Sequence, residues 1–361
     1  MSRKLIFVLA LVTSQYAYAS VELSDKLSLS GFGSSSVTKS DNETPLIINR
    51  RIVDQWCWDC DTTFGLQLDY YNDAFKASAQ VVKRPQDKWS NPELEWAYLG
   101  YTHENFEFRA GRLRLPAFLA SEYYFVGHAY KTARPPEELY NSILGITAYN
   151  GINLVWNFEL FDTYQVNVTP FIGFEDENTL EISKSFHVDV DVKDILGFST
   201  ELHGDFFKWK FTYFDAEYDQ VFIFNNPAPG VAKREIDLPD RRFELYSLGA
   251  EYELNNWTLT AERQIGNVRS TWYASLAYRM HKFTPYILYG ETKTKKTDVT
   301  PFDGKSGSSS VIGIRYDILN NLSVNMELQS FKSFAGERGS FTTTPQDRDA
   351  DLATVMFNFV F

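Results

Sequence analysis

The chain has 361 residues and a formal net charge of −12, and 16% of its residues are aromatic. The acidic balance argues against a nucleic-acid partner, and the absence of any run of 18 or more apolar residues excludes a membrane-spanning helix. A mean hydropathy of −0.30 together with 29 Phe, 21 Tyr and 8 Trp instead suits a transmembrane barrel. There, only one face of each strand meets lipid and aromatic girdles mark both interfaces.

The N-terminus has the organisation of a secretory signal peptide. Arg3 and Lys4 precede a short apolar stretch at residues 5–12, and Ala17-Tyr18-Ala19 forms a small-x-small cleavage site. We therefore expect residues 1–19 to be removed after Ala19, leaving residues 20–361 as a single barrel domain. The alternative is an apolar helix that is retained, although its core is too short to span a membrane.

The two cysteines lie close together in Trp56-Cys57-Trp58-Asp59-Cys60. An exported protein meets an oxidising compartment, where we expect Cys57 and Cys60 to form a small disulfide loop. Free thiols or a metal site are the alternative, and redox catalysis is less favoured than either. Zinc would need further ligands, and the sequence has no second CxxC and no HxxxH motif.

Alternation of apolar and polar residues predicts sixteen antiparallel strands. Very short turns and long polar loops join them in turn, as in outer-membrane barrels. A soluble β-sandwich is the alternative, but its strands average only about 5–6 residues. The expected strands lie at or near residues 26–37, 61–71, 74–84, 93–102, 106–111, 145–158, 164–174, 196–202, 207–213, 246–252, 257–261, 272–278, 283–289, 312–318, 322–328 and 355–361. An acidic loop is expected up to about residue 192, and another long loop at residues 219–241.

The C-terminus carries the most specific motif. Phe357, Phe359 and the terminal Phe361 alternate with Asn358 and Val360. This pattern resembles the terminal strand of outer-membrane barrels, in which the last aromatic residue is read by the assembly machinery. An ordinary closing strand that happens to end in Phe is the alternative.

As a whole, the mature chain resembles the general porins of Gram-negative bacteria. The resemblance implies an all-β, up-and-down transmembrane barrel, a homotrimer, and contact with outer-membrane lipid, lipopolysaccharide and the barrel-assembly machinery. In general porins the loop after the fifth strand folds inward and narrows the pore. Residues 112–142 resemble that loop in position, length and their Gly111-Arg112 entry, although the acidic Pro-Glu-Phe-Gly-Gly type of sequence is absent.

Two sets of charged or titratable residues are candidates for the pore lining. Those expected on the constriction loop are Arg112, Arg114, Glu122, His128, Lys131, Arg134, Glu137 and Glu138. Those expected on the barrel wall include Lys76, Glu95, Glu107, Arg109, Lys208, Lys210 and Arg315. Such charges can set a transverse field that solutes cross; the alternative is that they are solvated and without selective effect.

These features favour passive diffusion of ions and small hydrophilic solutes. A channel selective for an anionic or polyol ligand is the first alternative, and a receptor or adhesin closed by its loops is the second. An enzyme is less favoured because no Gly-x-Ser-x-Gly motif occurs and the five histidines are scattered. We expect no cofactor and no metal.

Overall fold

The structure is a computed structural model that describes residues 20–48, 50–85, 92–143, 146–183, 186–225, 233–297 and 300–361. The predicted signal peptide and its cleavage site at Ala19 lie outside the described residues. Among the described residues, no helix has the length and apolar character needed to cross a membrane.

Antiparallel strands dominate the described chain, and most of them pair with the next strand in sequence. The strand segments are β1 (Val21–Ser24), β2 (Leu27–Ser40), β3 (Thr63–Asn72), β4 (Phe75–Lys83), β5 (Glu93–His103), β6 (Phe106–Arg114), β7 (Ala148–Leu160), β8 (Tyr164–Phe174), β9 (Asp176–Ser183), β10 (Phe186–His203), β11 (Phe207–Phe224), β12 (Arg234–Leu254), β13 (Trp257–Gly266), β14 (Arg269–Tyr278), β15 (Phe283–Thr294), β16 (Gly304–Leu319), β17 (Leu322–Ser333) and β18 (Asp349–Val360).

The strands close into a barrel because β18 pairs with β2, from Val360 opposite Phe32 to Leu352 opposite Ser40. Two pairs of segments each act as one barrel strand. β8 and β9 are separated only at Glu175 and both pair with β10, while β1 and β18 share the edge of β2 that β3 does not use. Counting each pair once reduces the 18 segments to a 16-stranded barrel, which confirms the predicted fold.

Alternation places apolar residues outside and polar residues inside. On β13, Trp257, Leu259 and Ile265 are exposed on the outer face, whereas Glu262 and Gln264 are buried inside the barrel. Exposed apolar residues at alternate positions are what a lipid-facing surface requires.

Alternation over the expected fourth strand, residues 93–102, predicts Leu94, Trp96 and Tyr98 on one outer face; Leu94 is exposed there, but the prediction is wrong for Trp96 and Tyr98. A register shift opposite Gln80 and Val81 inserts an extra residue into β5, and such a bulge moves the following side chains to the other face. As a result, Leu99 is exposed on the outside, while Trp96 lies inside, where its Nε1 donates to Ser78 Oγ at 3.1 Å.

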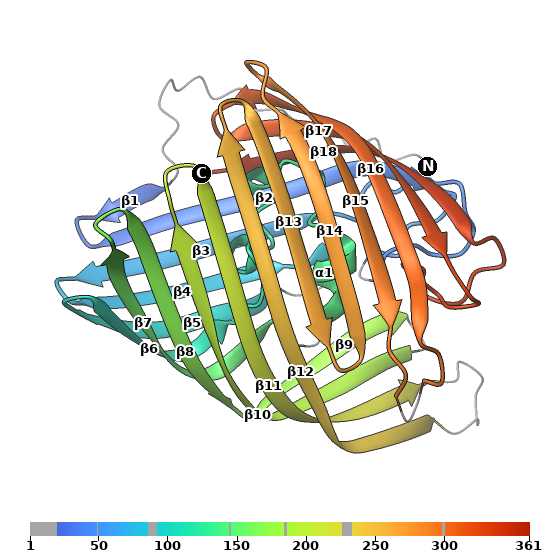
Figure 1. Cartoon of the computed structure of the whole chain (residues 1–361), viewed down its shortest axis with the longest axis horizontal. Helices are drawn as coiled ribbons and strands as arrows, with labels where there is room; N and C mark the ends of the chain where they lie inside the picture. The colour runs from blue at the N-terminus through green and yellow to red at the C-terminus, as the bar shows by residue number, and fades with distance from the viewer. Residues whose placement is uncertain are drawn as a thin grey trace, which may run out of the picture.

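The two long loops predicted up to residue 192 and at residues 219–241 are also wrong in large part. β10 already begins at Phe186, and β11 and β12 continue to Phe224 and from Arg234. Val188 pairs with Phe222, and Val190 with Gln220, so the ladder continues through a stretch whose acidic residues suggested a loop. In Figure 1 the yellow-green ends of β10–β12 extend beyond the ends of β13 and β14.

One end of the barrel carries short turns and the other carries long connections. The turns include the left-handed residues Asp73, Glu104, Asn255 and His281, whose positive φ suits tight reversals. We call the opposite end the long-loop end, because the connections containing residues 41–62, 115–147 and 334–348 lie there.

The connection between β6 and β7, here called the inner loop, is described at residues 115–143 and 146–147, and these residues fold into the barrel after the fifth barrel strand. The loop contains η2 (Ser121–Tyr123), η3 (Gly127–Ala129), α1 (Glu137–Tyr140) and η4 (Asn141–Ile143), and Figure 1 shows α1 within the ring of strands. Because β6 extends to Arg114, both Arg112 and Arg114 belong to the wall and not to the loop.

Candidate pore constriction

Glu262 on β13 holds the middle of the inner loop. Its buried carboxylate accepts hydrogen bonds from Leu119 N at 2.8 Å, Tyr140 Oη at 2.8 Å and Tyr273 Oη at 2.7 Å. A carboxylate buried inside a protein needs such donors to offset its lost hydration. Glu262 therefore fixes the loop at two points and ties it to β14.

Glu327 on β17 plays the same part farther along the loop. It accepts from Ala133 N at 3.0 Å and from Tyr286 Oη at 2.9 Å. Asn325, also on β17, donates to Lys131 O at 2.8 Å. Side chains of the wall opposite the entry of the loop thus form hydrogen bonds directly with the loop backbone.

A buried ion-pair cluster anchors the loop beside Glu327. Arg134 Nε donates to Asp61 Oδ1 at 2.8 Å, and Arg50 Nε contacts the same oxygen at 2.6 Å. Burial alone would raise the pKa of the Asp61 carboxyl, but Arg134 and Arg50 hold that pKa well below its usual range. The inner loop is thereby joined to the connection between β2 and β3.

His128 and Arg315 form a further anchor near the short-turn end. Arg315 Nη1 donates to His128 O at 2.6 Å, while His128 Nδ1 and Nε2 lie 3.0 Å from Ser323 Oγ and Asn320 O. Burial and the neighbouring Arg315 lower the pKa of His128. The contacts with Arg315 and those with Ser323 and Asn320 together hold His128 in place, so His128 has a positioning role in the loop.

The other side of the inner loop is apolar. Phe118, Leu139 and Ile143 belong to a buried cluster with Val190 of β10 and Phe214 of β11. This inner surface departs from the polar lining that a water-filled barrel usually carries. Packing against β10–β12 therefore complements the hydrogen bonds to β13–β18 and those that Thr212 and Ser247 donate to the carbonyls of Pro116 and Ala117.

A smaller group of charges remains partly exposed to the lumen. Arg109 Nη2 pairs with Glu107 at 2.8 Å, and Lys76 Nζ lies 5.7 Å from the ring centroid of Tyr98. Glu122 is exposed on the inner loop and interacts electrostatically with Arg109. Loop and wall charges thus face one another on this side.

A second charged group lies on β10–β12. Glu201 contacts Lys210 Nζ at 2.8 Å and Lys208 Nζ at 3.6 Å. Lys131 Nζ on the loop lies 3.9 Å from Glu251 and 3.7 Å from Glu253. These long pairs leave Lys131 partly exposed and available to solutes.

The structure divides the expected loop and wall charges into two kinds. Glu122 and Lys131 face the lumen, whereas Arg134, Glu137 and Glu138 are buried. Glu95 is buried between Arg84 and Arg114, and Arg112 pairs with Asp176 at 2.6 Å. Asp61 was missed because nothing in its neighbourhood indicates a partner 73 residues away.

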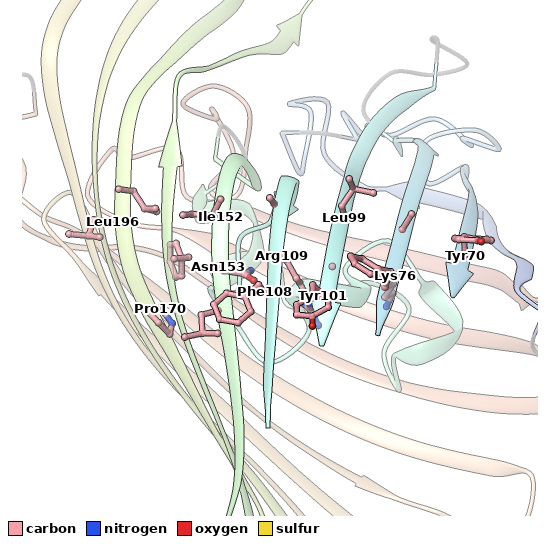
Figure 2. Close-up of a pocket in the computed structure, with 17 residues that line it drawn as sticks. Tyr70, Lys76, Leu99, Tyr101, Phe108, Arg109, Ile152, Asn153, Pro170 and Leu196 are labelled. Carbon is pink, nitrogen blue, oxygen red and sulfur yellow. The ribbon is translucent and has the colours of Figure 1, made fainter. Parts of the chain in front are cut away.

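One wide groove lies on the outer face of the barrel and not in the lumen. Its volume is about 740 Å³, and its lining includes Tyr70, Leu99, Phe108 and Ile152. Figure 2 shows these side chains spread over neighbouring strands of the wall. All four are exposed apolar or aromatic residues, so this groove belongs to the lipid-facing surface.

Two further predicted features are placed near the barrel seam. Phe361 exchanges backbone hydrogen bonds with Gly31 at 2.8 and 2.9 Å, and Phe357 and Phe359 are exposed on the outer face. Cys57 and Cys60 are joined by a disulfide, and the backbone of Cys57 pairs with that of Thr38 of β2 in an isolated antiparallel β-bridge. Both features lie where the two ends of the barrel wall meet.

The sequence matches no family model and no curated protein sequence. Solved structures do resemble the fold. Outer-membrane expressed OmpT of Vibrio cholerae has a TM-score of 0.62 and 12% identity, covering 94% of this chain and 99% of that one. OmpF of Salmonella typhi, in complex with daunomycin, has a TM-score of 0.61 and 13% identity, covering 95% and 100%.

An anion-selective porin from Comamonas acidovorans is similar to the same degree. Its TM-score is 0.61 and its identity 10%, with 93% of this chain and 99% of that chain covered. At such identities the likeness concerns the fold. The chain therefore has the 16-stranded fold found in porins.

Proposed function

From this porin fold, we propose that the protein is an outer-membrane porin through which ions and small hydrophilic solutes diffuse passively. The carrying observation is the closed 16-stranded barrel with an apolar outside and a loop folded into its lumen. A barrel of this strand number is too wide for wall side chains alone to fill. The inner loop then sets the size and field of the passage.

Single-channel conductance in a planar bilayer tests this proposal. Large, steady, stepwise conductance is expected from the purified protein, and a salt gradient gives the ion preference. A protein that shows the heat-modifiable migration of a folded barrel yet stays silent would overturn passive diffusion. Such silence would favour the receptor or adhesin, whose contact surface would be the projecting hairpins of β9–β12.

A substrate-selective channel is the second candidate, favoured by the many contacts that fix the inner loop. Saturable block of the conductance by one class of solute would distinguish it from a general porin. No catalytic step enters either proposal. His128, the histidine on the inner loop, is already engaged by Arg315, Ser323 and Asn320.

We further propose a homotrimer that contacts lipid, lipopolysaccharide and the barrel-assembly machinery. Small residues on β4–β6, among them Ala77, Ala79, Ala97 and Ala110, line a shallow depression of the outer face. Small side chains let another barrel approach closely. Chemical crosslinking in native membranes should give trimers, and replacement of Ala97 by Trp should reduce them.

A further inference from the structure

An apolar cavity of about 440 Å³ opens among the connections at the long-loop end. Val188 and Val190 of β10, Phe222 of β11 and Phe243 of β12 form one side, and Ile143 of the inner loop forms another. The volume falls within the range of small-molecule sites, roughly 300–1,000 Å³. The extended ends of β10–β12, which the sequence did not predict as strands, therefore surround a space large enough for a ligand.

Two arginines complete the lining of this cavity. Arg269 begins β14, and Arg338 lies on the connection between β17 and β18. In the part of the chain that the structure describes, no ion pair or side-chain hydrogen bond joins either guanidinium to another residue. Burial disfavours the charged form of both arginines, and Arg269 in addition lies near the like charge of Arg338.

The nearest carboxylates compensate this charge only in part. Glu137 and Glu337 interact electrostatically with Arg269, and Glu337 with Arg338, but none of them forms an ion pair or hydrogen bond with these guanidinium groups in the described residues. Burial and the adjacent Glu138 raise the pKa of Glu137 to about 8, so Glu137 is largely neutral near pH 7. Burial also lowers the pKa of Arg338. An incoming anion would relieve the cost of holding two cations beside an apolar surface.

We infer that this cavity binds a monocarboxylate with an aromatic body. The ring would lie against Phe222, Phe243 and the valines, and the carboxylate would accept hydrogen bonds from Arg269 and Arg338. A guanidinium suits this task because its planar fork matches both carboxylate oxygens. The inference names a solute class for the channel proposed above, and for any transport consequence it rests on that proposal.

Binding to the folded full chain tests the site by isothermal titration calorimetry near pH 7.5. The probe is 4-phenylbutanoate, and two matched compounds replace its carboxylate by an amide or an amine. We expect the carboxylate to bind about tenfold or more tightly than the amide, because hydrogen bonds between charged partners are stronger than those to a neutral amide. The amine should bind least.

The double variant Arg269→Gln/Arg338→Gln should lose the preference for the carboxylate over the amide. Arg348→Gln is the matched control, since Arg348 is an exposed arginine of the same connection as Arg338 and does not line the cavity; the preference should survive in it. Heat-modifiable migration verifies that each variant folds.

Three results would overturn the inference: equal affinity for carboxylate and amide, no binding of the carboxylate at millimolar concentration, or a preference that survives in the double variant. Calorimetry does not depend on ion flow, so a silent channel that binds the carboxylate would refute only the diffusion proposal. A conducting channel that does not bind it would refute only this site.

Discussion

The inner loop meets two walls of different chemistry. Toward β10–β12 it packs mainly on apolar side chains such as Val190 and Phe214. Two hydroxyl groups of this wall, on Thr212 and Ser247, also donate hydrogen bonds to the loop backbone near its start. Toward β13–β18 it meets buried polar groups, among them Glu262 and Glu327, which accept hydrogen bonds from its backbone. Packing is non-directional, whereas hydrogen bonds depend steeply on geometry. The buried carboxylates of β13–β18, together with the two hydroxyls of β11 and β12, therefore fix where the loop lies, and the apolar packing adds stability to that position.

The largest effect should come from the ion-pair cluster on the polar side. Asp61→Asn removes the carboxylate between Arg50 and Arg134 and leaves buried guanidinium groups without their main partner. We expect a loss of about 3–5 kcal/mol in the free energy of unfolding, measured by urea titration of the barrel in lipid vesicles. Current through the pore should also become noisier as the loop detaches.

Asp54→Asn is the matched control for that change, because Asp54 is exposed on the same connection between β2 and β3. Its effect should stay within about 0.5 kcal/mol. A second variant, Asp61→Asn/Arg134→Gln, should recover part of the loss because it removes one of the stranded charges. Equal stability of Asp61→Asn and wild type would contradict an anchoring role for the cluster.

A smaller loss is expected on the apolar side. Ile143, near the end of the inner loop, is buried beside Val190 of β10 and Phe243 of β12, so Ile143→Ala should cost about 2–4 kcal/mol through lost packing and a residual cavity. Leu99→Ala, on the exposed outer face, is the comparison and should cost less than about 1 kcal/mol. Urea titration of both variants in the same vesicles measures the two losses in the free energy of unfolding. A larger loss for Leu99→Ala than for the buried variant would contradict a stabilising role of the apolar packing.

The difference between the two walls also explains what the sequence could and could not predict. Alternation such as Trp257, Leu259 and Ile265 against Glu262 identifies each membrane strand locally, and it placed the inner loop after the fifth strand. Val188 and Val190 also alternate with polar residues, but those residues, Asp189 and Asp191, are charged and suggested a solvated loop. Because of these charged residues, the sequence did not predict the extension of the strand that forms the apolar wall.

Partners distant in sequence were beyond such reasoning. The sequence predicts Arg134 as a residue of the constriction loop, but its pairing with Asp61 depends on how the closed barrel brings distant strands together. The phase of β5 failed for a related reason, since a single bulge moves Trp96 inside without a local signal. Local sequence patterns indicate which face of a strand a residue lies on and how long the strand is. Buried ion pairs between distant residues form only when the whole sheet closes.

Between the two walls, Glu137 of α1 should make stability depend on pH. Burial and Glu138 raise its pKa to about 8, so the folded barrel favours the protonated acid. Its contribution is fully present below about pH 4.3, the pKa expected when unfolded, and is lost as pH rises through about 8. Ser340, Arg50 and Arg134 also face this carboxyl and oppose the shift.

Glu137→Gln should therefore match wild type near pH 5 and exceed it by about 1–3 kcal/mol near pH 9. Urea titrations at the two pH values measure this difference. Glu122→Gln, which removes an exposed carboxylate from the same loop, provides the control and should leave the pH dependence unchanged. A Glu137→Gln curve parallel to wild type would show that Glu137 is charged in the folded barrel.

The smallest effect on stability should come from Lys131, although its effect on ion flow should be clear. Its amine lies 3.9 and 3.7 Å from Glu251 and Glu253, and its side chain is 37% exposed. Partly exposed pairs of this kind contribute about 0–1 kcal/mol, so Lys131→Gln should leave the urea midpoint nearly unchanged. Loss of one positive charge in the lumen should move the reversal potential toward cation preference, and Glu122→Gln should move it the other way. A stability loss as large as that of Asp61→Asn would instead place Lys131 among the anchors of the loop and remove it from the passage.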